Sequence, residues 1–422
     1  MNTIVNPSRE KWESLCRRPQ YDRPGLEDIV SGILEKVRNE GDKALFELSE
    51  KFDGVKTENL KVPVSEIMEA EKNVPENLRD AILTAKANIE KFHRAQIRNE
   101  KIIETTKGVK CWRKSVPVER AGLYIPGGTA PLFSTVLMLA VPAKIAGCRE
   151  IILCTPPGKS GRVNPVILFT ANISGVTNIF KVGGAQAVAA MAYGTETIPG
   201  VDKIYGPGNQ YVTKAKEMVR LDGTAIDMPA GPSEVLVIAD RFADPSFIAS
   251  DLLSQAEHGT DSQVFLLTDS PGIIDTIRGE ISIQLDDLPR KEIASKALAN
   301  SYMILLNSLE ECMDFSNLYA PEHLIISTSD PGLLSGRVIN AGSVFIGKYS
   351  CESAGDYASG TNHTLPTGGF ARSFSGVSLD SFMKQITFQE LSPEGLKNIG
   401  PAIELMADAE NLSGHRNSVT LR

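Results

Sequence analysis

The runs Glu234-Val-Leu-Val-Ile238 and Gln263-Val-Phe-Leu-Leu267 decide the fold of this chain. Both are short and rich in β-branched and aromatic residues, and between them residues 245–257 have the pattern of a helix ending at Gly259. A run, a helix and a second run are typical of a βαβ unit, whose strands lie parallel and are buried on both faces. We therefore expect a parallel β-sheet at this point of the chain.

The same alternation of runs and helices extends from Glu150 to about residue 346. Further strands are predicted at residues 151–154, 178–182, 203–205, 302–306, 324–326 and 343–346. Because these are too many strands for one ordinary sheet, we expect an α/β fold with two Rossmann-like α/β/α domains and mostly parallel sheets. The segment Asp227-Met-Pro-Ala-Gly-Pro-Ser233 has the composition of the junction between them.

The two ends of the chain differ from this pattern. Residues 26–40, a segment from Asp42 to Gly54 and residues 75–99 have amphipathic helical periodicity, whereas residues 1–20 contain little apolar surface. We predict a helical N-terminal arm at 1–20, a larger domain at 21–123 and 235–378, a smaller domain at 124–234, and a helical C-terminal tail at 379–422. Residues 350–378 are rich in glycine and are predicted to form a functional loop.

The composition excludes several classes of protein. A net charge of −8 and the lack of Lys/Arg runs disfavour a nucleic-acid partner. The N-terminus lacks the pattern of a signal peptide, and the longest apolar run, 131–143, is too short and interrupted to cross a membrane. The six cysteines have no CxxC spacing, so we expect reduced thiols in a cytoplasmic protein.

Three glycine-rich turns follow predicted strands. They are Ile125-Pro-Gly-Gly128, Val182-Gly-Gly-Ala-Gln186 and Tyr205-Gly-Pro-Gly-Asn209. A glycine turn that leads into a helix exposes backbone N–H groups to an anion, although each is also compatible with a plain tight turn. None has the GxGxxG spacing of a dinucleotide fingerprint. Together, at the ends of strands of one sheet, they favour a ligand site there.

Four of the five histidines lie close to carboxylate or amide side chains. Gln255 and His258 are three residues apart on one helix face, Asp356 precedes His363 in the glycine-rich loop, and Glu410 precedes His415. Two imidazoles, a carboxylate and an amide oxygen are a possible zinc ligand set. A solvated helix end, with the histidine favoured by the helix dipole, explains Gln255 and His258 better when the two residues are judged alone.

The pair Glu322-His323 directly precedes a predicted strand. Two proton acceptors at a strand edge are suited to acid–base catalysis, and a turn with two exposed polar residues is the alternative. A thiol nucleophile such as Cys111 or Cys148 is a rival for aldehyde chemistry. Neither cysteine has a neighbouring base in the sequence, so we interpret both as structural.

Several segments together resemble one family. They include Gly122-Leu-Tyr-Ile-Pro-Gly-Gly-Thr129, Asp251-Leu-Leu-Ser-Gln-Ala-Glu-His-Gly259, Ala320-Pro-Glu-His-Leu324 and Gly355-Asp-Tyr-Ala-Ser-Gly-Thr-Asn-His363. On these motifs the chain resembles histidinol dehydrogenase over nearly its whole length. The resemblance implies NAD-linked, zinc-dependent oxidation of L-histidinol through L-histidinal to L-histidine.

The resemblance also implies a role for particular residues. One Zn²⁺ per subunit would be bound by Gln255, His258, Asp356 and His415, and Glu322 and His323 would be the catalytic bases. The substrate would be held by these metal ligands together with Ser233, His323 and Glu410, and NAD would contact Tyr124, Gln186 and Asn209. The family is a homodimer in which the tail of one subunit completes the site of the other.

Two other functions remain open at this stage. A zinc aminohydrolase acting on an imidazole-containing substrate would use the same metal ligands without NAD. A metal-buffering or sensing protein would bind the ion without turnover and would have no need of Glu322 beside His323.

Overall fold

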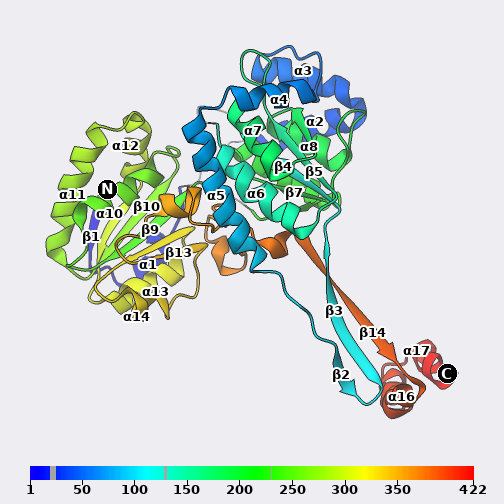
Figure 1. Cartoon of the computed structure of the whole chain (residues 1–422). Helices are drawn as coiled ribbons and strands as arrows, with labels where there is room; N and C mark the ends of the chain where they lie inside the picture. Colours follow the sequence, from blue (N-terminus) through cyan, green and yellow to red (C-terminus); the bar gives the residue numbers. More distant parts are fainter. Residues whose placement is uncertain (20–24, 128–130, 230) are drawn as a thin grey trace.

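Two parallel β-sheets, each covered by helices on both faces, make up most of the molecule (Figure 1). A computed structural model of the chain describes residues 1–19, 25–127, 131–229 and 231–422. Mixed α/β architecture with mostly parallel sheets is therefore confirmed. No helix among these residues is long and apolar enough to cross a bilayer.

The six-stranded sheet contains both runs that decide the fold. Its strands, in spatial order, are β1 (Asn2–Val5), β11 (Tyr302–Leu305), β10 (Gln263–Thr268), β9 (Glu234–Ala239), β12 (His323–Ser327) and β13 (Ser343–Ile346), all parallel. Alternate residues of β9 enter different cores, since Val235 and Val237 belong to one cluster and Leu236 and Ile238 to another. Burial on both faces explains why this strand is continuously apolar.

Helices cover the two faces of this sheet. On the Val235 face lie α10 (Pro245–Ala256), α11 (Pro271–Asp286) and α12 (Lys291–Ala299). On the Leu236 face lie α1 (Arg9–Leu15), α13 (Leu309–Tyr319) and α14 (Pro331–Ser335). The N-terminal arm thus packs within its own chain: β1 pairs with β11, and Trp12 of α1 is buried. The prediction of a helical arm holds for α1 but missed β1.

The five-stranded sheet has the order of a Rossmann fold. Its strands are β6 (Asn178–Lys181), β5 (Glu150–Thr155), β4 (Arg120–Tyr124), β7 (Lys203–Tyr205) and β8 (Ala225–Ile226), all parallel. They are connected by α6 (Phe133–Ala146), α7 (Pro165–Ser174), α8 (Gly184–Tyr193) and α9 (Gln210–Leu221). Chain order reverses between β4 and β7, which is where open α/β sheets bind ligands.

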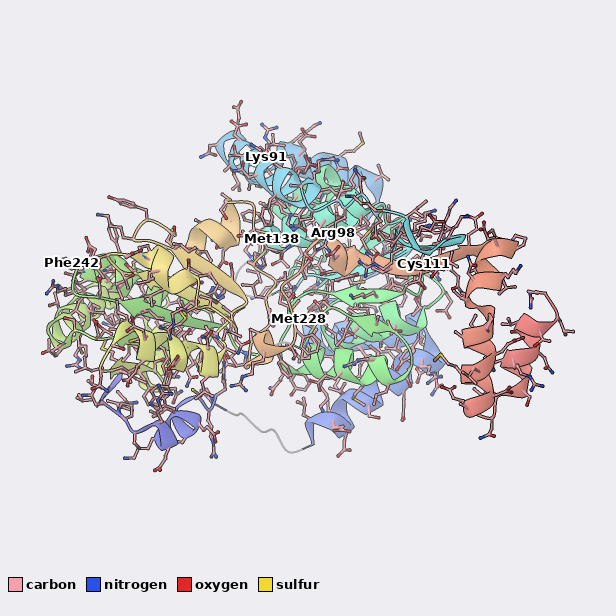
Figure 2. The ribbon with its side chains drawn as sticks, turned by 90° about the horizontal axis from the view of Figure 1, so that it is seen from below. Lys91, Arg98, Cys111, Met138, Met228 and Phe242 are labelled. Atoms are coloured by element: carbon pink, nitrogen blue, oxygen red, sulfur yellow. The ribbon has the colours of Figure 1, made fainter. Side chains whose placement is uncertain are left out.

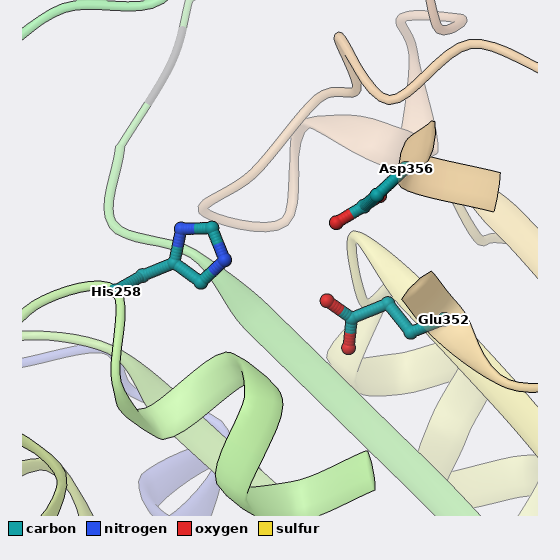
Figure 3. Close-up of side chains that lie close together, drawn as sticks. All are labelled: His258, Glu352 and Asp356. Atoms are coloured by element: carbon teal, nitrogen blue, oxygen red, sulfur yellow. The ribbon is translucent and has the colours of Figure 1, made fainter. Parts of the chain in front are cut away.

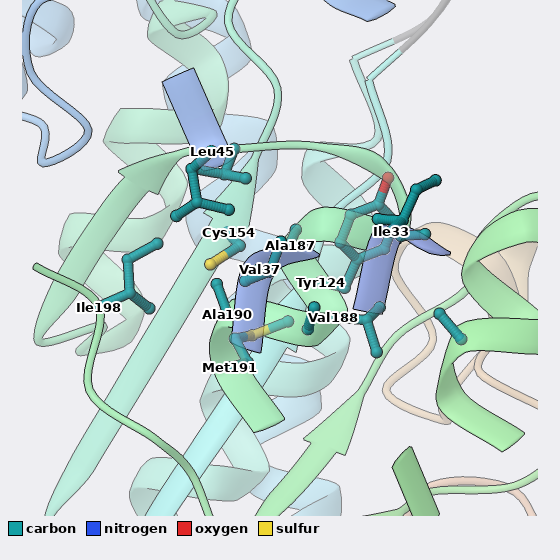
Figure 4. Packing of buried hydrophobic residues seen from close by; sticks show 14 of the residues in the cluster. Ile33, Val37, Leu45, Tyr124, Cys154, Ala187, Val188, Ala190, Met191 and Ile198 are labelled. Carbon is teal, nitrogen blue, oxygen red and sulfur yellow. The ribbon is translucent and has the colours of Figure 1, made fainter. Parts of the chain in front are cut away.

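The helices at residues 26–94 pack on the five-stranded sheet, which differs from the predicted division. They are α2 (Leu26–Glu40), α3 (Asp42–Asp53), α4 (Val64–Lys72) and α5 (Glu76–Arg94). Ile33, Val37 and Leu45 share one core with Tyr124 and Cys154 (Figure 4). Assigning residues 21–123 to the same domain as 235–378 was therefore wrong for these helices. An amphipathic pattern shows that a helix has a buried face but not which sheet covers it.

A long arm extends away from both domains (Figure 1). Antiparallel strands β2 (Ile103–Thr106), β3 (Val109–Pro117) and β14 (Met383–Leu391) form it, and α16 (Pro393–Ala409) and α17 (Ser413–Thr420) lie at its far end. The predicted helical tail therefore begins with a strand, because Lys384, Ile386 and Phe388 alternate with Gln385 and Thr387 in a β-like pattern.

The glycine-rich segment 350–378 is only partly irregular. It begins with the short helix α15 (Glu352–Tyr357) and contains the 3₁₀ turn η1 (Phe370–Arg372), and a second turn, η2 (Leu379–Phe382), follows it. Helix α15, near the start of this segment, packs against α10 and supplies side chains to the site described below.

Candidate active site

A cleft between the two domains contains residues from both. It has a volume of about 580 Å³ and is lined by Asn209 after β7, Ser233 before β9, His258 after α10 and Pro19 of the N-terminal arm. The five-stranded sheet contributes the carboxyl ends of its strands. The six-stranded sheet contributes amino ends, since Glu234 and His323 are the first residues of β9 and β12.

Three side chains converge on one point of this site (Figure 3). Each of His258, Glu352 and Asp356 has a possible ligand atom, and these atoms all lie within 4.8 Å of one another. His258 follows the end of α10, whereas Glu352 and Asp356 are four residues apart on α15 and so share a helix face. His258 and Asp356 are thus together as the zinc prediction requires.

Sequence reasoning missed Glu352. It is 1% exposed, and burial raises its pKa to about 8, with the nearby carboxylate of Asp356 adding to the rise. The signal in the sequence was its spacing of four from Asp356. That spacing becomes meaningful only once the segment is known to be helical.

Gln255 lies beside this group, on the last turn of α10. It is 1% exposed, its Nε2 is 3.4 Å from Oε2 of Glu322, and its side-chain oxygen faces the carboxylate of Glu352. Two acceptors that face each other are unsatisfied unless the amide rotates or a cation lies between them. A rotated amide donates to Glu352 and accepts from the backbone N–H of Glu234 at 3.1 Å.

Glu322 and His323 both contact the backbone of Glu234. Oε2 of Glu322 accepts from the Glu234 N–H at 2.8 Å, and Nδ1 of His323 lies 3.1 Å from the Glu234 carbonyl oxygen. Because a carbonyl only accepts, Nδ1 of His323 carries a proton, and Nε2 is the atom that faces the site. Nε2 lies 3.6 Å from Oδ1 of Asp356.

Charge and burial compete in this group. Burial raises the pKa of Glu322. Burial lowers the pKa of His323, but the charges of Glu322 and Glu352 and the nearby carboxylate of Asp356 outweigh it and raise that pKa well above its usual value. Such an excess of buried carboxylates is typical of a cation site.

The unsatisfied polar atoms fit a divalent cation. Oδ1 of Asp356 and Nε2 of His323 are buried and have no hydrogen-bond partner. Ligand atoms of His258, Glu352 and Asp356 lie within 4.8 Å of one another, Gln255 faces Glu352, and His323 lies beside Asp356. Imidazole nitrogen with carboxylate and amide oxygen suits zinc and several other divalent ions.

Two predicted site residues are not brought to this cleft by their own chain. Glu410 and His415 are exposed at the far end of the arm, at the end of α16 and on α17 (Figure 1). His363 is near the site, but its Nε2 contacts another residue: it lies 3.4 Å from Oγ1 of Thr135.

The residues predicted to contact NAD follow strands of the five-stranded sheet. The hydroxyl of Tyr124 accepts from the N–H of Gly184 at 3.1 Å, and Gln186 is buried in the first turn of α8. The side-chain oxygen of Asn209 caps α9 by accepting from the N–H groups of Tyr211 and Val212. Their strands β4, β6 and β7 share one sheet, as the three glycine turns predicted. Part of the first turn, residues 128–130, lies outside the described residues.

The two cysteines considered as nucleophiles, Cys111 and Cys148, belong to other elements than the cluster of possible metal ligands. Cys111 is on the extended arm (Figure 2), and Cys148 follows the end of α6, where burial raises the pKa of its thiol to about 11. All six thiols are unpaired. A high pKa disfavours the thiolate, so the interpretation of Cys148 as structural is supported.

Comparison with known proteins gives one consistent result. Residues 16–422 match the family model described as histidinol dehydrogenase. Histidinol dehydrogenase of Bacteroides thetaiotaomicron is 58% identical over 422 residues, covering 100% of this chain and 99% of that protein. That of Vibrio parahaemolyticus is 51% identical over 427 residues, with 100% and 98% covered.

The solved structures agree. The crystal structure of histidinol dehydrogenase from Elizabethkingia anophelis is 56% identical and covers 100% of this chain and 97% of that chain, with a TM-score of 0.98. An NAD-dependent aldehyde dehydrogenase from Sinorhizobium meliloti, 14% identical with a TM-score of 0.51, covers 92% of this chain and 88% of its own and shares the fold alone. Identity above one half over the full length, together with the converging His258, Asp356, Glu322 and His323, assigns the chain to the histidinol dehydrogenase family of oxidoreductases.

Proposed function

We propose that this protein oxidises L-histidinol through L-histidinal to L-histidine, with one Zn²⁺ per subunit and two molecules of NAD⁺ per turnover. The observation that carries this proposal is the cleft itself. Asn209 and His258 both line it, His258 belongs to a cluster suited to a divalent cation, and His323 adjoins that cluster, with its Nε2 3.6 Å from Oδ1 of Asp356. Acid–base groups would therefore lie next to the carboxyl edge of the five-stranded, Rossmann-like sheet.

Gln255, His258 and Asp356 would hold the metal, with His415 as the fourth ligand. When bound, zinc would fix the imidazole and amine of the substrate and so orient its alcohol carbon. Ser233, which lines the cleft, and Glu410 would contact the rest of the substrate. Glu352, buried beside Gln255, would keep the amide oriented.

The charge of a bound Zn²⁺ would offset the carboxylates that raise the pKa of His323, so that its Nε2 could take the proton of the alcohol in the first oxidation. This nitrogen faces the site, because Nδ1 is engaged by the Glu234 carbonyl. NAD⁺, contacted by Tyr124, Gln186 and Asn209, would accept one hydride from the carbinol carbon and, in the second oxidation, one from the hydrated aldehyde. Each oxidation transfers one hydride, with its two electrons, to NAD⁺ and one proton to a base: His323 in the first oxidation and Glu322 in the second.

Glu322 would activate the water of the second oxidation. Burial raises the pKa of its carboxyl, which makes the carboxylate a stronger base than an exposed one. Water adds to the aldehyde carbon, its proton passes to Glu322, and the hydrate loses hydride to form the carboxylic acid. A closed cleft would keep the aldehyde from escaping between the two steps.

A homodimer would complete the site. The extended arm exposes apolar side chains such as Leu405, which is 73% exposed, and Met406, which is 65% exposed. Such a surface favours burial against a second copy of the chain. Glu410 and His415 of one subunit would then enter the cleft of the other. The six unpaired thiols support a reducing, cytoplasmic location.

The test is NADH release from the purified protein with L-histidinol. We expect about two NADH per histidinol consumed, loss of activity after chelation, and recovery with Zn²⁺. Turnover of an imidazole substrate without NAD⁺ would instead indicate an aminohydrolase. Metal binding without any turnover would indicate a buffering protein.

A further inference from the structure

We propose that Arg18 of the N-terminal arm is a positioning residue that aligns Glu322 and His323 by fixing Glu234. This inference rests on the proposed function, because it assigns Arg18 to the same two oxidations. Arg18 lies next to the cleft, in the segment that also contributes Pro19 to the cleft wall.

One residue orients both proposed bases. The N–H of Glu234 donates to Glu322 at 2.8 Å, while the carbonyl oxygen of the same residue accepts from Nδ1 of His323 at 3.1 Å. Rotation of the Glu234 backbone would therefore misplace both side chains at once.

The buried carboxylate of Glu234 accepts hydrogen bonds from both Arg18 and the backbone. The side chain is 1% exposed and receives two bonds from Arg18, from Nε at 2.8 Å and from Nη2 at 3.0 Å. It also accepts from the N–H of Gly368 at 2.8 Å. A two-pronged guanidinium–carboxylate pair fixes direction as well as distance.

Arg18 also holds the chain that leads to Glu322. Its Nη2 donates to the carbonyl oxygen of Tyr319 at 2.7 Å, and its guanidinium lies 3.7 Å from the centre of the Tyr319 ring. Only Ala320 and Pro321 separate Tyr319 from Glu322. Arg18 thus restrains the start of β9 and the segment before β12 together, which a side chain with a single donor would not do.

The test compares Arg18→Met and Arg18→Lys with the wild-type enzyme. Misplacement of reacting groups by about 1 Å lowers rates up to about 100-fold. We expect Arg18→Met to lower kcat of both half-reactions by at least about tenfold, with KM for histidinol and NAD⁺ and the zinc content nearly unchanged. Arg18→Lys should recover part of kcat, because one charged donor remains.

Arg9→Met is the matched control. Arg9 lies on the same arm and pairs with Asp314 of α13 at 2.8 Å, but both side chains are exposed and neither touches Glu234. Its kcat should equal that of the wild type. A folded Arg18→Met enzyme with wild-type kcat, or an equal loss in Arg9→Met, would overturn the inference.

A second variant covers the case in which Arg18→Met does not fold. Glu234→Gln keeps the size and one acceptor of the side chain but weakens the bond to Arg18, so a smaller loss in both half-reactions is expected. Unchanged half-reactions in Glu234→Gln would also overturn the inference. Inactivity of the wild type towards histidinol would instead refute the proposed function itself.

Discussion

Glu322 and His323 are neighbours in the chain, and the proposed mechanism gives each of them a different oxidation step. In Glu322→Gln the amide oxygen can still accept from the Glu234 N–H, but no carboxylate remains to take a proton from water. We expect the first oxidation to persist and the second to slow by about 10²–10⁴-fold. Counting NADH against histidinol consumed would then give one instead of two. An equal loss of both oxidations would contradict the role given to Glu322.

Asp53 gives a prediction for the pH dependence of stability. Its Oδ2 is buried without a partner, it ends α3, where the helix dipole disfavours negative charge, and burial raises its pKa to about 6. Because the folded pKa lies above the unfolded value, ionised Asp53 destabilises the fold. The penalty is absent below about pH 4 and is complete above about pH 6.

Asp53→Asn should therefore stabilise the protein only at neutral and higher pH. After a discount for partial exposure, we expect a gain of about 1 kcal/mol in the free energy of unfolding near pH 8. Little gain is expected near pH 4. Urea unfolding at both pH values checks this. The same gain at both would show that ionisation of Asp53 is not the cause.

At the residue scale, the sequence predicted the proposed site residues better than the buried residues that hold them in position. Gln255, His258, Asp356, Glu322 and His323 lie close together, as the family resemblance implied; their spacing in the sequence did not by itself require it. Glu352 and Arg18 were missed. Their roles depend on contacts with residues distant in the chain, and no local pattern distinguishes a buried carboxylate or guanidinium from an exposed one.

Among the elements, the turn after β7 leaves no room for a larger residue at Gly206. Gly206 has φ of +120°, and a Cβ there would collide with the carbonyl oxygen of Tyr124. Its N–H donates to Asp227 and its carbonyl accepts from Lys216, both at 2.8 Å, and these two side chains form a buried ion pair. This network fixes the start of the loop that carries Asn209.

Gly206→Ala should displace that loop and weaken the cofactor site. We expect KM for NAD⁺ to rise by about tenfold or more, while the metal content stays at one per subunit. Gly223→Ala is the matched control, since Gly223 has φ of +103° but nothing within 4 Å of an added Cβ. It should cost about 1–2 kcal/mol of stability without changing KM. Equal KM values for the two variants would contradict the role of the turn.

The elements that sequence predicted best are those buried on both faces. β9 and β10 are wholly buried, so their composition alone identifies them. β14 was missed because its side chains are mostly exposed and alternate polar with only a few apolar residues. β1 is a four-residue edge strand whose pairing with β11 depends on a segment about 300 residues away.

At the scale of the whole molecule, the arm and tail expose more apolar surface than an isolated chain would be expected to leave in water. β14, α16 and α17 lie away from both cores and present Leu405, Met406 and Leu412 to solvent. Exposed apolar surface on a long projection costs stability unless another surface covers it. The same tail carries His415, the one predicted metal ligand that its own chain does not bring to the cleft. Sequence reasoning alone could not show this separation, because it depends on how far the strands project.

A mixed-subunit experiment tests whether the tail completes the partner's site. His258→Asn removes a ligand in the cleft and His415→Asn one in the tail, so each variant should lose zinc and activity. If sites are shared, a dimer containing one chain of each kind has one intact site, and an equal mixture should regain about a quarter of wild-type activity. Mixing His258→Asn with Asp356→Asn is the control, because both changes lie in the cleft and every site stays defective. Recovery in neither mixture would mean that each chain builds its site alone, and the exposed tail would then need a different partner.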